Sequence, residues 1–142
     1  YISKVRQFMV QNEHEGEILV LEGIASHGYE EIKEMIRLEA VLLDEGNEEV
    51  ASKEFLCGNT VTIYQLQVMR EGDLESSLSA NANVMISNMN LKPGDEVPFM
   101  VIFFDPPEDV SDYTLRAVGI GDPDEENETP GYLEKRIEVI IL

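Results

Sequence analysis

The stretch "LKPGDEVPFMVIFFDPPEDV", residues 91–110, decides the fold class of this 142-residue chain. Pro93 and Gly94 fit the two central positions of a type II turn, because proline fixes a negative φ and glycine supplies the positive φ that follows. Residues 97–104 then place apolar side chains on both alternating faces of a strand. Such a strand is buried on both sides or lies centrally under a helix. Because Pro98 cannot donate a ladder hydrogen bond, we expect it at the beginning of this strand.

The segments around this stretch are short and separated by glycine and proline, which is typical of a β-rich domain. Further strands are expected over 3–10, 18–26, 32–44, 48–57 and 112–120. Segment 32–44 also has the Glu, Met and Leu content of a helix. Its alternating apolar residues, and the turn at 44–47 that leads into 48–57, favour a hairpin of two strands.

One short helix is expected after this hairpin, capped by Asn59 or Thr60. Its buried face is predicted to carry Ile63, Leu66 and Met69.

The segment that follows this helix is predicted to be irregular. Residues 70–73 ("REGD") are expected to end the helix. Residues 74–89 could start with a helical turn. They are rich in Ser and Asn, whose side chains bond to nearby backbone, so they are expected to become irregular and to form a loop or crossover between sheets. The fold is therefore predicted to be mainly β: an immunoglobulin-like antiparallel β-sandwich with one short crossover helix.

The length fits one domain. Residues 1–120 are predicted to form the β-sandwich domain, 121–131 an acidic loop or linker, and 132–142 a C-terminal strand or tail. The apolar end at 139–142 either docks on the chain's own sheet or pairs with another chain, so a homodimer remains an open alternative.

Charge narrows the classes of partner. The formal net charge of −19 disfavours nucleic acid and anionic membrane surfaces, both of which require clustered Lys and Arg. It favours basic protein partners. The longest apolar runs are about eight residues, too short to span a bilayer. No signal peptide is visible, and a chain that begins at Tyr1 rather than Met is compatible with an excised piece of a longer protein.

Three segments in order resemble the bacterial domain of unknown function 3426: "EGEILVLEGIASH" (15–27), "EMIRLEAVLLDEGNEEVASKEFLCGN" (34–59) and "LKPGDEVPFMVIFFDPPEDVSDYTLRAVG" (91–119). Members often have Asn where this chain has His27. The family typically carries a preceding zinc ribbon and single transmembrane helix, which this sequence lacks. The resemblance implies an immunoglobulin-like β-sandwich outside the cytoplasmic membrane, attached through that anchor. It implies no activity and no catalytic residues.

Candidate reactive residues are few. His14 and His27 show no metal-ligand spacing, so a turn or surface role is favoured for His27 over a metal ligand. The single cysteine, Cys57, is predicted to be a buried structural thiol, with a redox-sensor or intermolecular-disulfide role as the alternative. No nucleophile elbow, phosphate loop or dinucleotide fingerprint is present.

The cluster "DPDEENE" (122–128) invites a calcium interpretation. Compared with an EF-hand loop, it has Asn127 where glycine is needed and Leu133 where the bidentate glutamate is needed. A solvated linker is therefore favoured, and cation binding is the alternative.

These observations predict a non-enzymatic accessory or protein-interaction domain of a membrane-anchored bacterial protein, which presents edge strands or loops to a protein partner. No catalytic, cofactor-binding or metal-binding residue is assigned, and no cofactor is expected. The alternative is a domain that binds a small ligand or calcium. An enzyme would require His14 or His27 to meet Cys57 or a serine within hydrogen-bond reach.

Overall fold

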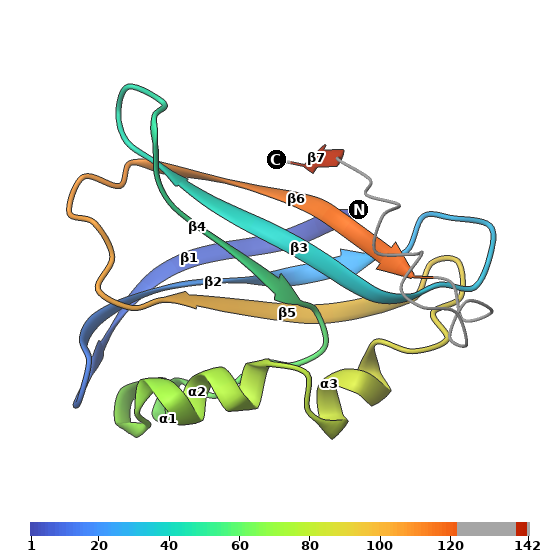
Figure 1. The fold of residues 1–142 in the computed structure, drawn as a ribbon, viewed down its shortest axis with the longest axis horizontal. Helices are drawn as coiled ribbons and strands as arrows, with labels where there is room; N and C mark the ends of the chain where they lie inside the picture. The colour runs from blue at the N-terminus through green and yellow to red at the C-terminus, as the bar shows by residue number, and fades with distance from the viewer. Residues whose placement is uncertain (122–138, 142) are drawn as a thin grey trace.

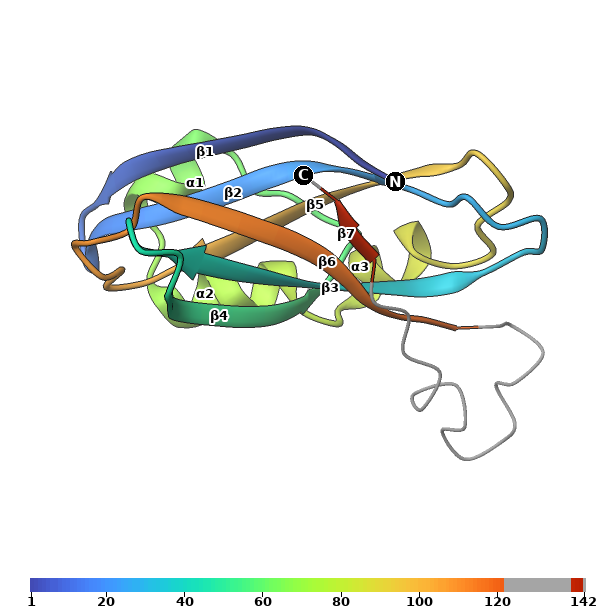
Figure 2. The same ribbon diagram turned by 90° about the horizontal axis from the view of Figure 1, so that it is seen from above.

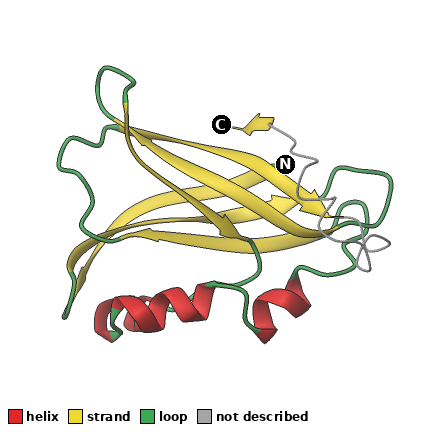
Figure 3. Cartoon of the chain, in the orientation of Figure 1, coloured by secondary structure: helices red, strands yellow, loops and turns green. Residues whose placement is uncertain are grey.

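The computed structural model describes residues 1–121 and 139–141, and within them seven strands and three short helices follow one another (Figure 1). The elements are β1 (Ile2–Asn12), β2 (Gly16–Ser26), β3 (Glu34–Leu43), β4 (Glu49–Leu56), α1 (Ile63–Val68), α2 (Glu71–Leu78), α3 (Ala82–Ser87), β5 (Glu96–Phe103), β6 (Asp112–Gly121) and β7 (Val139–Ile141). Figure 3 shows the strands stacked above a layer of helices. No helix in these two ranges is long and apolar enough to cross a membrane.

The strands form two antiparallel sheets, one in the order β1-β2-β5 and the other in the order β4-β3-β6-β7. The hairpins β1–β2 and β3–β4 lie in different sheets. The connection after β4 carries the helices and leads back to the first sheet, where β5 pairs with β2. This is the strand order of an immunoglobulin-like sandwich in which β4 takes the position of strand C′. The predicted fold class is confirmed.

A buried apolar core fills the space between the sheets. It takes alternate side chains from β2, β3, β5 and β6: Leu19, Leu21, Leu38, Ala40, Leu42, Val97, Phe99, Val101 and Leu115. Segment 32–44 is therefore a strand with one face in this core, as its alternation predicted.

A second core lies on the outer face of the β1-β2-β5 sheet, under the helices. The sheet contributes Val10, Ile18, Val20, Met100 and Ile102, and the helical segment contributes Val61, Leu66, Leu74 and Leu78. Strand β5 is thus apolar on both faces because one face meets the other sheet and the other face meets the helices.

The turn and the proline at the start of β5 follow the prediction. Gly94 has a φ of +89°, and the N–H of Asp95 donates to the carbonyl of Lys92 at 2.9 Å, as a tight turn requires. Pro98 is the third residue of β5, which is an edge strand, so the missing N–H costs no ladder bond in the sheet interior.

The connection between β4 and β5 holds three short helices where the sequence predicted one. Helix α1 is capped by Thr62 rather than by Asn59 or Thr60: the Thr62 hydroxyl accepts from the Gln65 N–H at 3.1 Å, and the Gln65 side chain accepts from the Thr62 N–H at 2.8 Å. Leu66 is fully buried as predicted, but Ile63 is 50% exposed, so its assignment to the buried face is wrong.

The helix predicted after the hairpin does end before residues 70–73, because Met69 is the C-cap of α1. Arg70 is then the N-cap of a second helix, and residues 71–73 form its first turn. Residues 74–89 belong to the crossover between the two sheets, as predicted, but the expectation of an irregular loop is wrong. The Ser and Asn side chains of 74–89 do bond to nearby backbone, but they do so within helices. The Ser77 hydroxyl donates to the Asp73 carbonyl at 3.0 Å, and the Asn81 side chain caps α3 by accepting from the N–H three residues later.

Strand β7 pairs with β6 of the same chain, through Ala117↔Val139 to Leu115↔Ile141. The rest of the predicted acidic linker and C-terminal segment, 122–138 and 142, lies outside the described residues.

Candidate functional site

His27 organises the connection between β2 and β3. Its Nδ1 accepts from the N–H of Tyr29 at 3.0 Å, so Nε2 carries the proton that is donated to the Glu31 carbonyl. The side chain is 2% exposed. Both ring nitrogens are therefore committed to backbone groups, and the predicted turn role is correct while a surface position is wrong.

Cys57 lies in the core between the sheets and is fully buried. Burial raises the pKa of the Cys57 thiol far above its ordinary value, which disfavours the thiolate, the nucleophilic form. The predicted buried structural thiol is confirmed.

Metal ligands do not gather in the part of the chain that the structure describes, where no three His, Cys, Asp or Glu side chains lie close enough to hold an ion. The calcium interpretation concerns 122–128, which is outside the described residues, and it stays a prediction.

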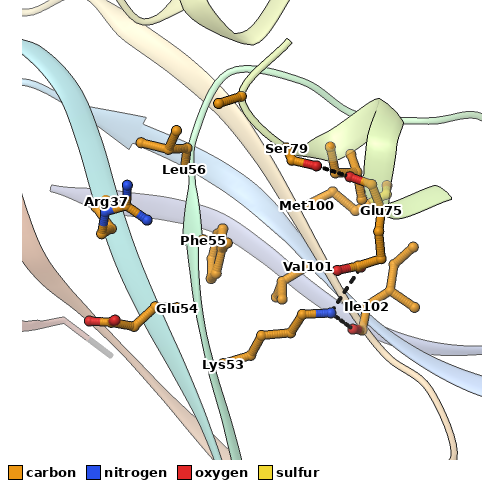
Figure 4. Close-up of a pocket in the computed structure, with 12 residues that line it drawn as sticks. Arg37, Lys53, Glu54, Phe55, Leu56, Glu75, Ser79, Met100, Val101 and Ile102 are labelled. Atoms are coloured by element: carbon orange, nitrogen blue, oxygen red, sulfur yellow. Dashed lines mark hydrogen bonds and ion pairs between the residues drawn. The ribbon is translucent and has the colours of Figure 1, made fainter. Parts of the chain in front are cut away.

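A hollow of about 250 Å³ lies between α2, β4 and β5 (Figure 4). Figure 4 shows Lys53 reaching from β4 across this hollow. Its Nζ donates to the Glu75 carboxylate and to the Ile102 carbonyl, both at 2.9 Å, and lies 5.5 Å from the centre of the Phe104 ring. These contacts tie α2 to the open side of β5, so we assign Lys53 a structural role.

The other structural feature with binding potential is the set of sheet edges, because an edge strand presents unpaired N–H and C=O groups. The β5 edge is partly closed: the N–H of Gly58 donates to the Pro98 carbonyl at 2.8 Å, and Lys53 occupies the Ile102 carbonyl. Strand β4 carries charges at Glu49, Lys53 and Glu54, which discourage pairing. Strand β7 has only three residues.

Strand β1 is the fourth edge and spans 11 residues. Figure 2 shows it along one side of the molecule, with no described strand beyond it. Its first half is irregular. The register with β2 shifts between Ser3 and Arg6, Lys4 has a φ of +54°, and Arg6 donates to the Glu22 carboxylate from Nε at 2.9 Å.

The second half of β1, residues 7–11 with the sequence QFMVQ, has a regular register with β2 and no charged residue. We call these five residues the free edge. Met9, at its centre, is 45% exposed. The β5 edge has a longer regular and uncharged run, 97–103, but Gly58 and Lys53 partly close it. Among the described residues, the free edge is therefore the regular and uncharged edge that no such contact closes.

A groove of about 350 Å³ lies beside the free edge, which we call the β1 groove. Its lining comes from β1, β2 and the β5–β6 connection and includes Gln7, Met9, Glu17, Leu19, Pro106 and Val110. The lining is mixed, with apolar walls and carboxylates from Glu17 and Glu108.

Asn12 fixes the end of the free edge. Its Nδ2 donates to the carbonyls of Leu66 and Met69, each at 2.7 Å, and its Oδ1 accepts from the N–H groups of His14 and Glu15. A buried amide with both ends bonded holds the β1–β2 turn against α1. The sequence predicted this strand, but its local pattern could not show that β1 is an edge strand of the sheet.

Comparison with known proteins gives a single assignment. The family described as "Protein of unknown function (DUF3426)" matches residues 2–117. No curated protein and no solved structure gives a significant match to the chain.

Proposed function

The chain belongs to the DUF3426 family of proteins of unknown function, and from this premise we propose that it is a non-enzymatic accessory domain that binds a protein partner. One observation carries the proposal: the free edge is regular and uncharged, and no described strand pairs with its outer side, in a chain whose formal net charge is −19.

The physical argument rests on how soluble proteins treat sheet edges. Edge strands usually carry charges, bulges or covering groups, because a bare edge pairs with other chains. Among the residues that the structure describes, β4 is charged and β5 is partly closed, while 7–11 have neither protection. A bare edge on an otherwise protected sandwich supports strand addition by a partner, in which main-chain hydrogen bonds supply affinity. The acidic surface would speed association with basic partners.

We also propose that the domain lies outside the cytoplasmic membrane and is attached to it in the full-length protein. The support is the resemblance in the sequence, since family members typically place a membrane helix before this domain. The test is protease treatment of spheroplasts that express the full-length protein with a tag on this domain. Loss of the tag in intact spheroplasts is expected, and protection until lysis would contradict the location.

The binding proposal is tested with the tagged domain as bait in a bacterial membrane extract, beside an unrelated acidic domain of matched net charge. We expect a partner that the control does not retain and that binds the purified domain saturably. If purified candidates bind both domains equally, or if nothing exceeds the control, the protein-binding proposal fails.

A further inference from the structure

We propose that the partner contributes an extended segment that adds as a strand to residues 7–11 of β1 and places an apolar side chain, flanked by Lys or Arg, in the β1 groove. This inference rests on the proposed function and deepens it, because it names the site and the chemistry of the partner.

The face of the groove follows from the register. Met9 pairs with Leu19, and Gln11 pairs with Glu17, so these side chains share one face of the sheet. Leu19 belongs to the core between the sheets, which places the β1 groove on the inner face. A strand added to β1 would direct every second side chain to that same face. Those side chains would meet the groove directly.

The apolar walls define what enters the groove. Leu19 is buried, and Pro106 and Val110 are partly buried. Met9 is exposed and unbranched, so it can adjust to the shape of an incoming side chain. An aliphatic side chain would bury apolar surface against these four residues, and this burial favours binding.

The charges around the groove favour a basic segment. Glu17 and Glu108 line it and are exposed, and no Lys or Arg side chain from the described residues lines it. A cation on either side of the aliphatic residue would therefore find a carboxylate, and the formal charge of −19 would attract it from a distance. A second copy of the chain is disfavoured as the occupant because it brings the same net charge of −19.

Asn12 and Arg6 make the edge ready for binding. Asn12 fixes the turn end of β1 to α1, and the Arg6 ion pair with Glu22 lies at the other end of the free edge. Because the five residues between them already have strand geometry, β1 loses little conformational entropy on association.

The probe is a blocked synthetic peptide, Thr-Lys-Val-Leu-Val-Lys-Thr, whose second, fourth and sixth residues share one face of a strand. Two controls have the same length: one replaces both lysines by glutamate, and the other carries N-methyl groups on alternate backbone nitrogens. Amide chemical shifts of the labelled domain are followed by NMR as each peptide is added. We expect saturable changes at residues 7–11 and 108–110 with the basic peptide alone.

Two variants of equal charge locate the site. Met9→Lys places a charge at the free edge and the groove, and Ser52→Lys places it at an exposed position on the β4 edge. Both positions are at the surface, and thermal unfolding verifies that each variant is folded. We expect Met9→Lys to weaken peptide binding by roughly tenfold or more, and Ser52→Lys by less than about twofold, where tenfold equals about 1.4 kcal/mol.

Four outcomes overturn this inference: no binding of the basic peptide at millimolar concentration, equal binding of the N-methylated or acidic peptide, shift changes confined to other elements, and equal effects of the two variants.

Sedimentation of the purified domain adds a fifth outcome that would overturn it. If the unmodified domain is a dimer that Met9→Lys converts to a monomer, a second copy occupies the edge. If the bait captures its partner equally with Met9→Lys, the site is wrong while the proposed function stands.

Discussion

The two outer faces of the sandwich differ in composition and in what lies against them. The outer face of the β1-β2-β5 sheet is apolar and packs under the helices, through side chains such as Val20 and Ile102. The outer face of the β4-β3-β6-β7 sheet carries the ion pair of Glu39 and Arg116, and no described helix lies on it (Figure 1). The pattern of apolar residues along the strands therefore indicates which sheet has a layer of helices on its outer face.

Removing apolar contact from the covered face should have the largest effect. Leu74 of α2 is fully buried in the core under the helices. We expect Leu74→Ala to lower the free energy of unfolding by about 2–5 kcal/mol, because transfer free energy is lost and a cavity remains. Urea unfolding measures this change.

The matched control is Thr114→Ala on the outer face of the other sheet, where Thr114 pairs with Val41. It should change the free energy of unfolding by less than about 0.5 kcal/mol. Equal effects of the two variants would show that the two outer faces contribute equally to the free energy of unfolding.

The sequence predicted the strands better than the helices for a physical reason. Alternation in 32–44, the turn at Pro93 and Gly94, and the apolar strand 97–104 are local signals, and the structure confirms each. Helices α2 and α3 are short, and their stability comes from burying residues such as Leu74 and Val84 rather than from propensity. Ser and Asn content alone therefore predicted an irregular segment at 74–89 instead of these helices.

The free edge and the β1 groove could not be predicted from local sequence patterns, for a related reason. The strand over 3–10 was predictable, but its place at the end of a sheet depends on which strands pair across the whole chain. The β1 groove likewise joins β1 and β2 to Pro106 and Val110, which are about 100 residues away in the sequence. Cys57 was predictable as a buried thiol because a lone cysteine without a recognisable base behaves as a small hydrophobe.

The second prediction concerns the polar link between the covered face and the free edge. Asn12→Ala removes both Nδ2 bonds to α1 and leaves the carbonyls of Leu66 and Met69 without this donor. We expect a loss of about 1–3 kcal/mol in the free energy of unfolding, because buried acceptors become unsatisfied. Asn83→Ala, at an exposed position of α3, is the control and should be near neutral. A loss below about 0.5 kcal/mol for Asn12→Ala would contradict the anchoring role.

The third prediction uses Cys57, which lies in the core that both sheets share. Burial raises the pKa of this thiol in the folded state, while the unfolded value is about 8.5. Above about pH 8.5 the thiol loses its proton in the unfolded chain but keeps it in the folded protein, and this difference favours the unfolded state. The contribution of the thiol is complete below this pH and falls by about 1.4 kcal/mol for each pH unit above it.

Urea unfolding in the presence of a reductant, for the unmodified protein and for Cys57→Ala, isolates this contribution. The difference in free energy of unfolding between the two should decrease by about 1.4 kcal/mol from pH 7 to about pH 9.5. Other groups that titrate in this range, such as Lys and Tyr, cancel in the difference. A difference that does not change with pH would mean that the thiol reaches solvent in the folded state.

The smallest effect is expected at the uncovered face, from the pair Glu39 and Arg116. The Arg116 Nε donates to the Glu39 carboxylate at 2.7 Å, and the side chains are 35% exposed for Arg116 and 18% for Glu39. A double-mutant cycle with Glu39→Ala and Arg116→Ala should give a coupling of about 0.2–1 kcal/mol, because water screens the pair. Added salt should reduce this coupling further. A coupling above about 2 kcal/mol that salt does not change would place the pair in a dry environment. The outer face of the β4-β3-β6-β7 sheet would then be covered in solution as the other face is, and the difference in strand pattern would have to be explained by a polar rather than an apolar covering layer.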